Sequence, residues 1–194
     1  MKLARLVELG RTVRVVGFDD APFSRTRGAV VPIVGVVCAD TRFEGMLWGR
    51  TRRDGWGATD ALVKMVTGSK FHPQVHVILL DGIALGGFNV IDLPALAAAT
   101  GLPCVAVMRR PPNMDAVRSA VARLPGSARR MERITRAGAI YQRPPFTFQV
   151  QGAEPDVIAR VLTRLTWQGH VPEALRLAHL IGSAVKLGES TRRA

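Results

Sequence analysis

The sequence has little cysteine: Cys38 and Cys104 are the two among its 194 residues. Each lies in an apolar stretch, which indicates buried thiols in a reducing compartment rather than a disulfide framework. The histidines His72, His76 and His170 lack zinc-like spacing with each other or with a cysteine. The sequence therefore argues against a disulfide-stabilised fold and against a structural zinc site.

Long apolar runs are lacking as well. No run approaches the length of a membrane span, and residues 1–5 lack the apolar core of a signal peptide. We therefore expect a soluble, cytoplasmic protein with no membrane partner. Hydrophobic residues make up 47% of the chain and charged residues 22%, which is typical of a globular protein. No repeat or linker divides the chain, so residues 1–194 are expected to form one domain.

Acidic residues are scarce relative to basic ones. The chain has 15 Asp and Glu against 27 Lys and Arg, which gives a net charge of +12. This surplus favours polyanions, because phosphates that Lys or Arg neutralise release their condensed counterions. Arginine outnumbers lysine, and its planar donor fork suits phosphate. Nucleic acid is one interpretation of the charge, and a solvated basic surface is the other.

The hydrophobic pattern indicates a mixed α/β fold. Strand-like residues 12–18, 30–39 and 42–52 are joined by short connections, which predicts an antiparallel three-strand meander. Almost continuous apolar runs at 75–80 and 104–108 are typical of strands that are covered on both faces. Helices are expected after Thr59 as N-cap and over 93–100, 114–124, 127–137, 154–167 and 173–187, with a last strand over 146–151. The order predicts a mixed sheet flanked by helices.

Three carboxylates occur where such a sheet would place a site. Asp19 follows the first strand, Asp81 follows the buried central strand, and Asp60 begins the helix between them. Open α/β sheets bind ligands at the carboxyl ends of their strands. Hard oxygen ligands hold Mg²⁺ or Mn²⁺, and phosphate oxygens complete the coordination shell. The alternative is structural, because aspartate is also common in turns and at helix N-termini.

Other motifs contribute little chemistry. Residues 82–87 are glycine-rich but match neither a P-loop nor a dinucleotide fingerprint, so a tight turn is expected. No serine nucleophile elbow or reactive-cysteine signature occurs. Asp20 adjoins Asp19 but should point to the other side of an extended strand, so we assign it to a turn or to the support of the site.

Three segments, residues 16–23, 79–90 and 172–181, carry a resemblance to a known family. They resemble an uncharacterised, largely archaeal family of unknown function. That family is similar in turn to endonuclease V, a metal-dependent nuclease of the ribonuclease H-like fold. The resemblance extends from about Arg14 to about Glu189. It implies a ribonuclease H-like mixed sheet, Mg²⁺ or Mn²⁺ as cofactor, and DNA or RNA as partner.

The resemblance also implies roles for individual residues. Asp19 and Asp81 resemble the metal-binding aspartates of the nuclease, and Asp60 stands where the nuclease has a glutamate. His179 resembles a histidine that faces the same site, and Arg109 stands where the nuclease has a lysine near the scissile phosphate. The implied catalytic set is therefore Asp19, Asp60, Asp81, Arg109 and His179, with the three aspartates as metal ligands. The aspartate at position 60 is one methylene shorter than a glutamate.

A second departure concerns recognition of the substrate. The nuclease inserts a wedge that contains Pro-Tyr beside damaged bases, and the corresponding residues 51–58 contain no Pro-Tyr. Recognition of deaminated bases is therefore not carried over. Trp56 either stacks on a base or anchors the packing of the loop. The arginines within 50–53, 109–110 and 129–136 form solvated faces or, together, a phosphate track.

The leading hypothesis is a divalent-metal phosphodiesterase that acts on DNA or RNA. His179 would orient water or the phosphate, and Arg109 would neutralise charge on the phosphate. The alternative is a catalytically silent nucleic-acid-binding protein of the same fold, in which Asp60 in place of glutamate has abolished turnover. A third interpretation is a small-nucleotide hydrolase or ligand sensor.

Overall fold

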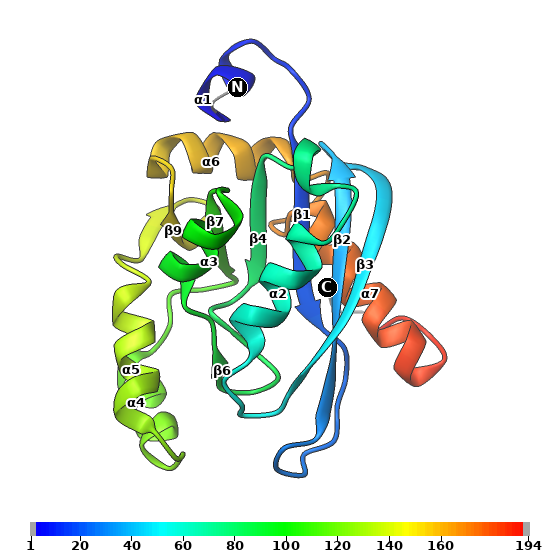
Figure 1. The fold of residues 1–194 in the computed structure, drawn as a ribbon. Helices are drawn as coiled ribbons and strands as arrows, with labels where there is room; N and C mark the ends of the chain where they lie inside the picture. Colours follow the sequence, from blue (N-terminus) through cyan, green and yellow to red (C-terminus); the bar gives the residue numbers. More distant parts are fainter. Residues whose placement is uncertain (1–2, 192–194) are drawn as a thin grey trace.

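The computed structural model describes residues 3–191, whose main sheet has seven strands in the order β3-β2-β1-β4-β7-β9-β8 (Figure 1). The strands are β1 (Arg14–Asp20), β2 (Val30–Ala39), β3 (Arg42–Arg52), β4 (Val77–Asp81), β7 (Cys104–Met108), β8 (Tyr141–Arg143) and β9 (Phe146–Gln151). Strands β1, β2 and β3 form an antiparallel meander, while β4 runs parallel to β1 and β7 runs parallel to β4. This arrangement confirms the predicted mixed sheet.

Helices cover both faces of the sheet, as predicted (Figure 1). They are α1 (Leu3–Glu8), α2 (Ala58–Thr67), α3 (Leu93–Thr100), α4 (Met114–Ala122), α5 (Ser127–Arg136), α6 (Pro155–Arg164) and α7 (Glu173–Leu187), with a 3₁₀ turn, η1 (His72–Gln74). Helices α6 and α7 pack on one face, and α2 and α3 pack on the other. No helix within residues 3–191 is both long enough and apolar enough to span a membrane.

The core has two halves because successive strand residues point to opposite faces. In β1, Val15 packs toward α7 and Val16 packs toward α2. In β4, Leu79 packs toward α7 and Leu80 packs toward α2. Odd-numbered residues of both strands therefore face α7, and this parity extends to the residues that end the strands.

Capping residues explain the boundaries of α3 but not those of α2. Helix α3 has the predicted bounds: the Asp92 side chain caps its start, and Gly101 ends it in the left-handed conformation at φ 67°. The prediction of Thr59 as the N-cap of α2 is wrong, since the helix already begins at Ala58. The Thr59 hydroxyl instead accepts a hydrogen bond from the Asp92 backbone N–H at 3.0 Å.

The short elements that the sequence does not predict are α1, η1, β8 and a hairpin of β5 (Ala84–Leu85) and β6 (Asn89–Val90). Two-residue strands are too short to show a hydrophobic period. The expected glycine turn is present inside this hairpin, where Gly86 and Gly87 have φ values of 60° and 83°.

Both cysteines are free and fully buried, which confirms the prediction of buried thiols. Burial raises the pKa of the Cys38 thiol to about 12 and that of the Cys104 thiol to about 12. Since the thiolate is the reactive form, both side chains are inert at neutral pH.

Candidate metal centre

Asp19 and Asp81 meet at the carboxyl ends of neighbouring strands. Strands β1 and β4 are parallel, with Phe18 opposite Leu80, so the two aspartates occupy the next positions along each strand. Both aspartates are at odd-numbered positions, so both side chains point toward α7, as those of Val15 and Leu79 do. One ligand atom from each aspartate and one from His179 of α7 lie within 4.8 Å of one another.

Two glycines allow α7 to approach the sheet closely enough for His179 to reach this cluster. A Cβ on Gly17 of β1 would lie 2.9 Å from the Cβ of Ala174 in α7, closer than real contacts allow. A Cβ on Gly182 would lie 3.1 Å from the Cα of Ala21. The helix therefore crosses directly over β1, which places His179 beside the end of that strand.

Hydrogen bonds hold His179 against Asp19. The imidazole Nδ1 lies 2.9 Å from Oδ2 of Asp19, and Nε2 lies 3.1 Å from the Thr191 hydroxyl. Thr191 also lies 3.3 Å from the hydroxyl of buried Ser183. Residues 191–194, at the end of the sequence, are predicted to form a frayed tail. That prediction is wrong for Thr191, which these two contacts fix beside α7. The remaining residues of that expected tail, 192–194, lie outside the described residues.

The charges of the cluster fit a cation. The pKa of Asp19 is raised to about 7, mainly by burial and further by repulsion from Asp81 and Asp20, while the hydrogen bond and the charge of His179 oppose the rise. A cation beside Asp19 would therefore favour its ionised form. A divalent ion would act in this way, and carboxylate oxygens are the ligands that Mg²⁺ and Mn²⁺ prefer.

Arg109 lies at the rim of the cluster. It follows the end of β7, and its Nη2 is 3.7 Å from Oδ2 of Asp81. Half of its side chain is exposed, so the guanidinium faces both the carboxylate and the solvent. An arginine in this position can donate to an anion that approaches Asp81 from outside.

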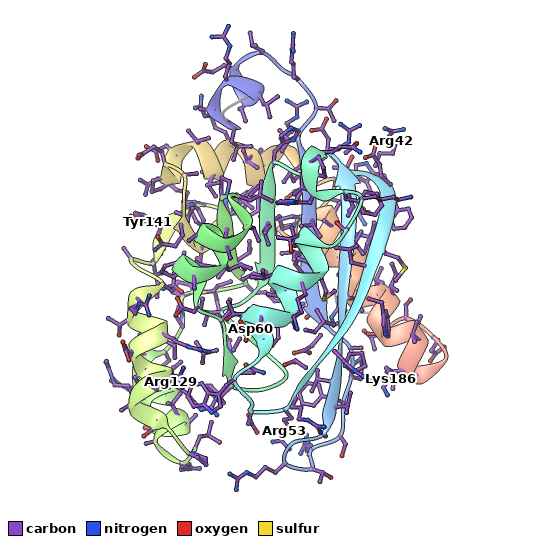
Figure 2. The ribbon with its side chains drawn as sticks, in the orientation of Figure 1. Arg42, Arg53, Asp60, Arg129, Tyr141 and Lys186 are labelled. Atoms are coloured by element: carbon purple, nitrogen blue, oxygen red, sulfur yellow. The ribbon has the colours of Figure 1, made fainter. Side chains whose placement is uncertain are left out.

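The structure does not bring Asp60 into the cluster. Figure 2 shows Asp60 at the start of α2, where its side chain is exposed. Helix α2 packs on the face opposite α7, whereas Asp19 and Asp81 turn toward α7. Within residues 3–191, the group of metal-binding side chains that includes these two aspartates is completed by His179, not by Asp60. Asp60 lies in the first turn of α2, where its negative charge interacts favourably with the helix dipole. This is the structural alternative for the residue.

Asp20 points to the other face, as expected from the pleat of the strand. Its Oδ2 accepts a hydrogen bond from the Gly86 backbone N–H in the β5–β6 hairpin. Burial raises the pKa of Asp20, and this bond opposes the rise. Asp54 anchors the same hairpin, since its carboxylate accepts from Phe88 N–H at 2.9 Å and its own N–H donates to the Gly86 carbonyl at 2.9 Å.

Arginines of α5 hold the loop between β3 and α2. The Arg130 guanidinium lies 4.2 Å from the centre of the Trp56 ring, is buried, and donates to the carbonyls of Asp54 (2.6 Å) and Phe88. Arg133 also lies over the ring and donates to a backbone carbonyl of β6 at 2.9 Å. Trp56 is therefore a packing anchor. Arg130 and Arg133 do not belong to a phosphate track, because carbonyls of the protein already bind them.

The fold places the protein in a class. Endonuclease V of Bacillus subtilis has the same fold at a TM-score of 0.57 and 12% identity, with 89% of this chain and 80% of that chain covered. Endonuclease V of Ciona intestinalis, in complex with DNA containing an inosine followed by a ribo-adenosine, gives a TM-score of 0.56 at 13% identity, with 96% and 95% covered. The protein thus has an endonuclease V-like, ribonuclease H-like fold with an Asp/His cluster at the strand ends.

The family is more specific. The family model for Endonuclease dU matches residues 11–186, and the chain belongs to this family. It is 40% identical over 183 residues to a UPF0215 protein of Methanothermobacter thermautotrophicus, covering 92% of this chain and 90% of that protein. A UPF0215 protein of Deinococcus radiodurans is 41% identical over 181 residues, with 93% and 92% covered. A crystal structure of a protein of unknown function from Archaeoglobus fulgidus, 35% identical, gives a TM-score of 0.84 over 89% of this chain and 98% of that chain. These findings confirm the predicted family and its similarity to endonuclease V.

Proposed function

We propose that this protein is a divalent-metal-dependent phosphodiesterase that cleaves nucleic acid. Its active site lies where β1 and β4 end. The observation that carries the proposal is the convergence of Asp19, Asp81 and His179 within 4.8 Å in a chain of net charge +12. Positive charge attracts a polyanion, whereas a local group of carboxylates attracts a cation. The two requirements of metal-assisted phosphodiester hydrolysis thus occur together.

Each residue of the cluster has a role in this proposal. Asp19 and Asp81 hold the cation, Mg²⁺ or Mn²⁺, which when bound would stabilise charge on the phosphate and lower the pKa of water. His179 fixes one oxygen of Asp19, and the Asp20 backbone N–H fixes the other at 2.8 Å. Arg109, beside Asp81, binds the scissile phosphate and neutralises its charge. Asp60 is not assigned a role in the reaction.

The substrate classes to test first come from the relatives. The matching family model is named for dU, and the Ciona endonuclease V was solved with inosine-containing DNA. We therefore propose DNA with deoxyuridine or deoxyinosine as the first substrates, with unmodified DNA and RNA beside them. Both single and double strands belong in the panel.

The experiment measures cleavage of end-labelled oligonucleotides on denaturing gels with Mg²⁺, Mn²⁺ or EDTA. We expect cleavage only with metal and a loss of about 100-fold or more in Asp81→Asn, since the bound metal contributes several kcal/mol. Asp60→Asn is the matched control and should cleave at close to the wild-type rate, because this side chain lies outside the cluster. Metal-dependent cleavage that survives Asp81→Asn would overturn the proposal.

The second candidate function is nucleic-acid binding without turnover. The observation that favours it is the position of Asp60, which leaves two carboxylates in the cluster that the described residues form. In that case the wild-type protein would bind oligonucleotides with strong salt dependence and cleave none of them with either metal. The cleavage panel distinguishes the two functions directly.

A further inference from the structure

A strongly basic pocket lies outside the metal centre. Its volume is about 510 Å³, and three segments far apart in the sequence form it: the loop after β1, the loop after β3, and the turn between α4 and α5. Figure 1 shows these segments at the end of the molecule toward which β1 points. Six arginines line the pocket together with one carboxylate, that of Asp54: Arg25, Arg27, Arg52, Arg53, Arg123 and Arg130.

The arginines differ in how far the protein already uses them. Arg130 is buried and donates to backbone carbonyls, and Arg53 lies 3.2 Å from the Asp54 carboxylate. Arg25, Arg27 and Arg123 are exposed and form no ion pair with a carboxylate in residues 3–191. Arg52 is also exposed, and it donates one hydrogen bond, to the Gly28 carbonyl at 3.1 Å, which leaves its other N–H groups for a ligand. Their charges are therefore available to an anion that enters the pocket.

The pocket and the metal centre are connected through the β5–β6 hairpin. Asp20, next to metal-centre residue Asp19, binds the Gly86 N–H, and pocket residue Asp54 binds the Gly86 carbonyl through its own N–H. The loop that contains Arg25 and Arg27 is the direct continuation of β1. The two sites thus lie at the same edge of the sheet, the metal centre on the α7 side and the pocket on the side of the β5–β6 hairpin.

We propose that this arginine pocket, defined by Arg25, Arg27, Arg52 and Arg123, binds backbone phosphates of a nucleic-acid strand that also reaches the metal centre. The inference rests on the proposed function for the identity of the strand. Arginine's planar fork binds phosphate oxygens in pairs. Since the arginines come from three segments around one pocket, they suit a chain of several phosphates better than a single small anion.

The test measures binding rather than cleavage. A fluorescein-labelled single-stranded oligonucleotide is titrated with protein in EDTA at several salt concentrations, and fluorescence anisotropy gives the affinity. Arg25→Gln/Arg27→Gln should weaken binding and reduce the slope of log affinity against log salt by about 1.4, since each single-strand phosphate contact contributes about 0.7. Both arginines are exposed, so the thermal midpoint should not change.

The matched control is Arg5→Gln/Arg160→Gln, which removes the same charge from exposed positions on α1 and α6. These helices contact each other at the opposite end of the molecule (Figure 1). The control should retain the wild-type slope. An equal loss in both double variants would overturn the proposal, because it would show a general effect of net charge.

Two further outcomes bear on the ligand. Addition of Arg123→Gln to Arg25→Gln/Arg27→Gln should reduce the slope again, which would support a pocket shared by separate segments. Inorganic phosphate or a mononucleotide that binds as tightly as the oligonucleotide would overturn the assignment to a strand. Because binding is measured without metal, absence of cleavage in the wild-type protein would contradict the proposed function and leave the result for the pocket intact.

Discussion

Asp19 and Asp20 are adjacent in sequence and end the same strand, yet their surroundings are opposite in character. Asp19 faces Asp81 and His179 on the α7 side, where burial and repulsion raise its own pKa to about 7. Asp20 faces the β5–β6 hairpin and binds a backbone N–H of Gly86. The pleat of the strand accounts for the difference, since it turns neighbouring side chains to opposite faces.

The two sides of this end of the sheet differ in how their polar groups are paired. On the hairpin side, polar groups satisfy one another: buried Asn89 donates to the Thr51 hydroxyl at 2.8 Å, and Arg130 donates to carbonyls of two loops. On the α7 side, carboxylates crowd together. Such a distribution is typical of proteins in which one region stabilises the fold while another region is strained for function. The predictions below separate stability from metal binding.

The largest effect on stability is expected for Arg130→Ala. The substitution leaves backbone carbonyls in the loops around Asp54 and Phe88 without a donor and removes the contact with Trp56. Each buried group without a partner costs about 1–3 kcal/mol, so a loss of about 3 kcal/mol or more in the free energy of unfolding is expected. Urea denaturation measures this loss.

Arg129→Ala is the control for that variant. Arg129, which is labelled in Figure 2, is exposed. Its guanidinium lies 4.9 Å from the centre of the Trp56 ring. An exposed cation–π contact contributes about 0.5–1 kcal/mol, so a small loss is expected. Equal losses in the two variants would show that the buried hydrogen bonds of Arg130 do not stabilise the loop.

The sequence predicted the strands that end at Asp19 and Asp81 better than the helix between them. Asp19 and Asp81 directly follow apolar strands, and the carboxyl ends of parallel neighbours meet at one edge, so their proximity was predictable. Asp60 follows no strand, and the place of a helix N-terminus depends on the face that the helix covers. The sequence pattern around residue 60 carries no information on that face.

The role of the arginines was harder to predict for a related reason. Arg129 and Arg130 are neighbours with the same chemistry, but one is exposed and the other is buried beneath a loop that lies far away in the sequence. Local patterns describe the helix and its charged face. They do not show that Trp56 and the carbonyls around it pack on that face, since such contacts arise only from the tertiary fold.

An intermediate effect is expected for Asp20→Ala. The variant removes a carboxylate that accepts from the Gly86 N–H, and it leaves this donor in a partly buried place. We expect a loss of about 1–3 kcal/mol in stability. A calorimetric titration with Mn²⁺ should still show binding, because Asp19, Asp81 and His179 are retained. Complete loss of Mn²⁺ binding would instead place Asp20 among the ligands.

A small effect on stability, of the opposite sign, is expected for Asp19→Asn. The amide removes a buried negative charge that Asp81 and Asp20 repel, while its oxygen can still accept a hydrogen bond. In EDTA we expect a gain on the order of 1 kcal/mol, which corresponds to a rise of roughly 2–4 °C in the thermal midpoint for a chain of this size. The same variant should lose Mn²⁺ binding by calorimetry, because it removes one of the two carboxylates in the cluster. A less stable variant that still binds Mn²⁺ would contradict this assignment. Asp19 would then be a structural carboxylate, and the carboxylates at the end of β1 would not form a cation site.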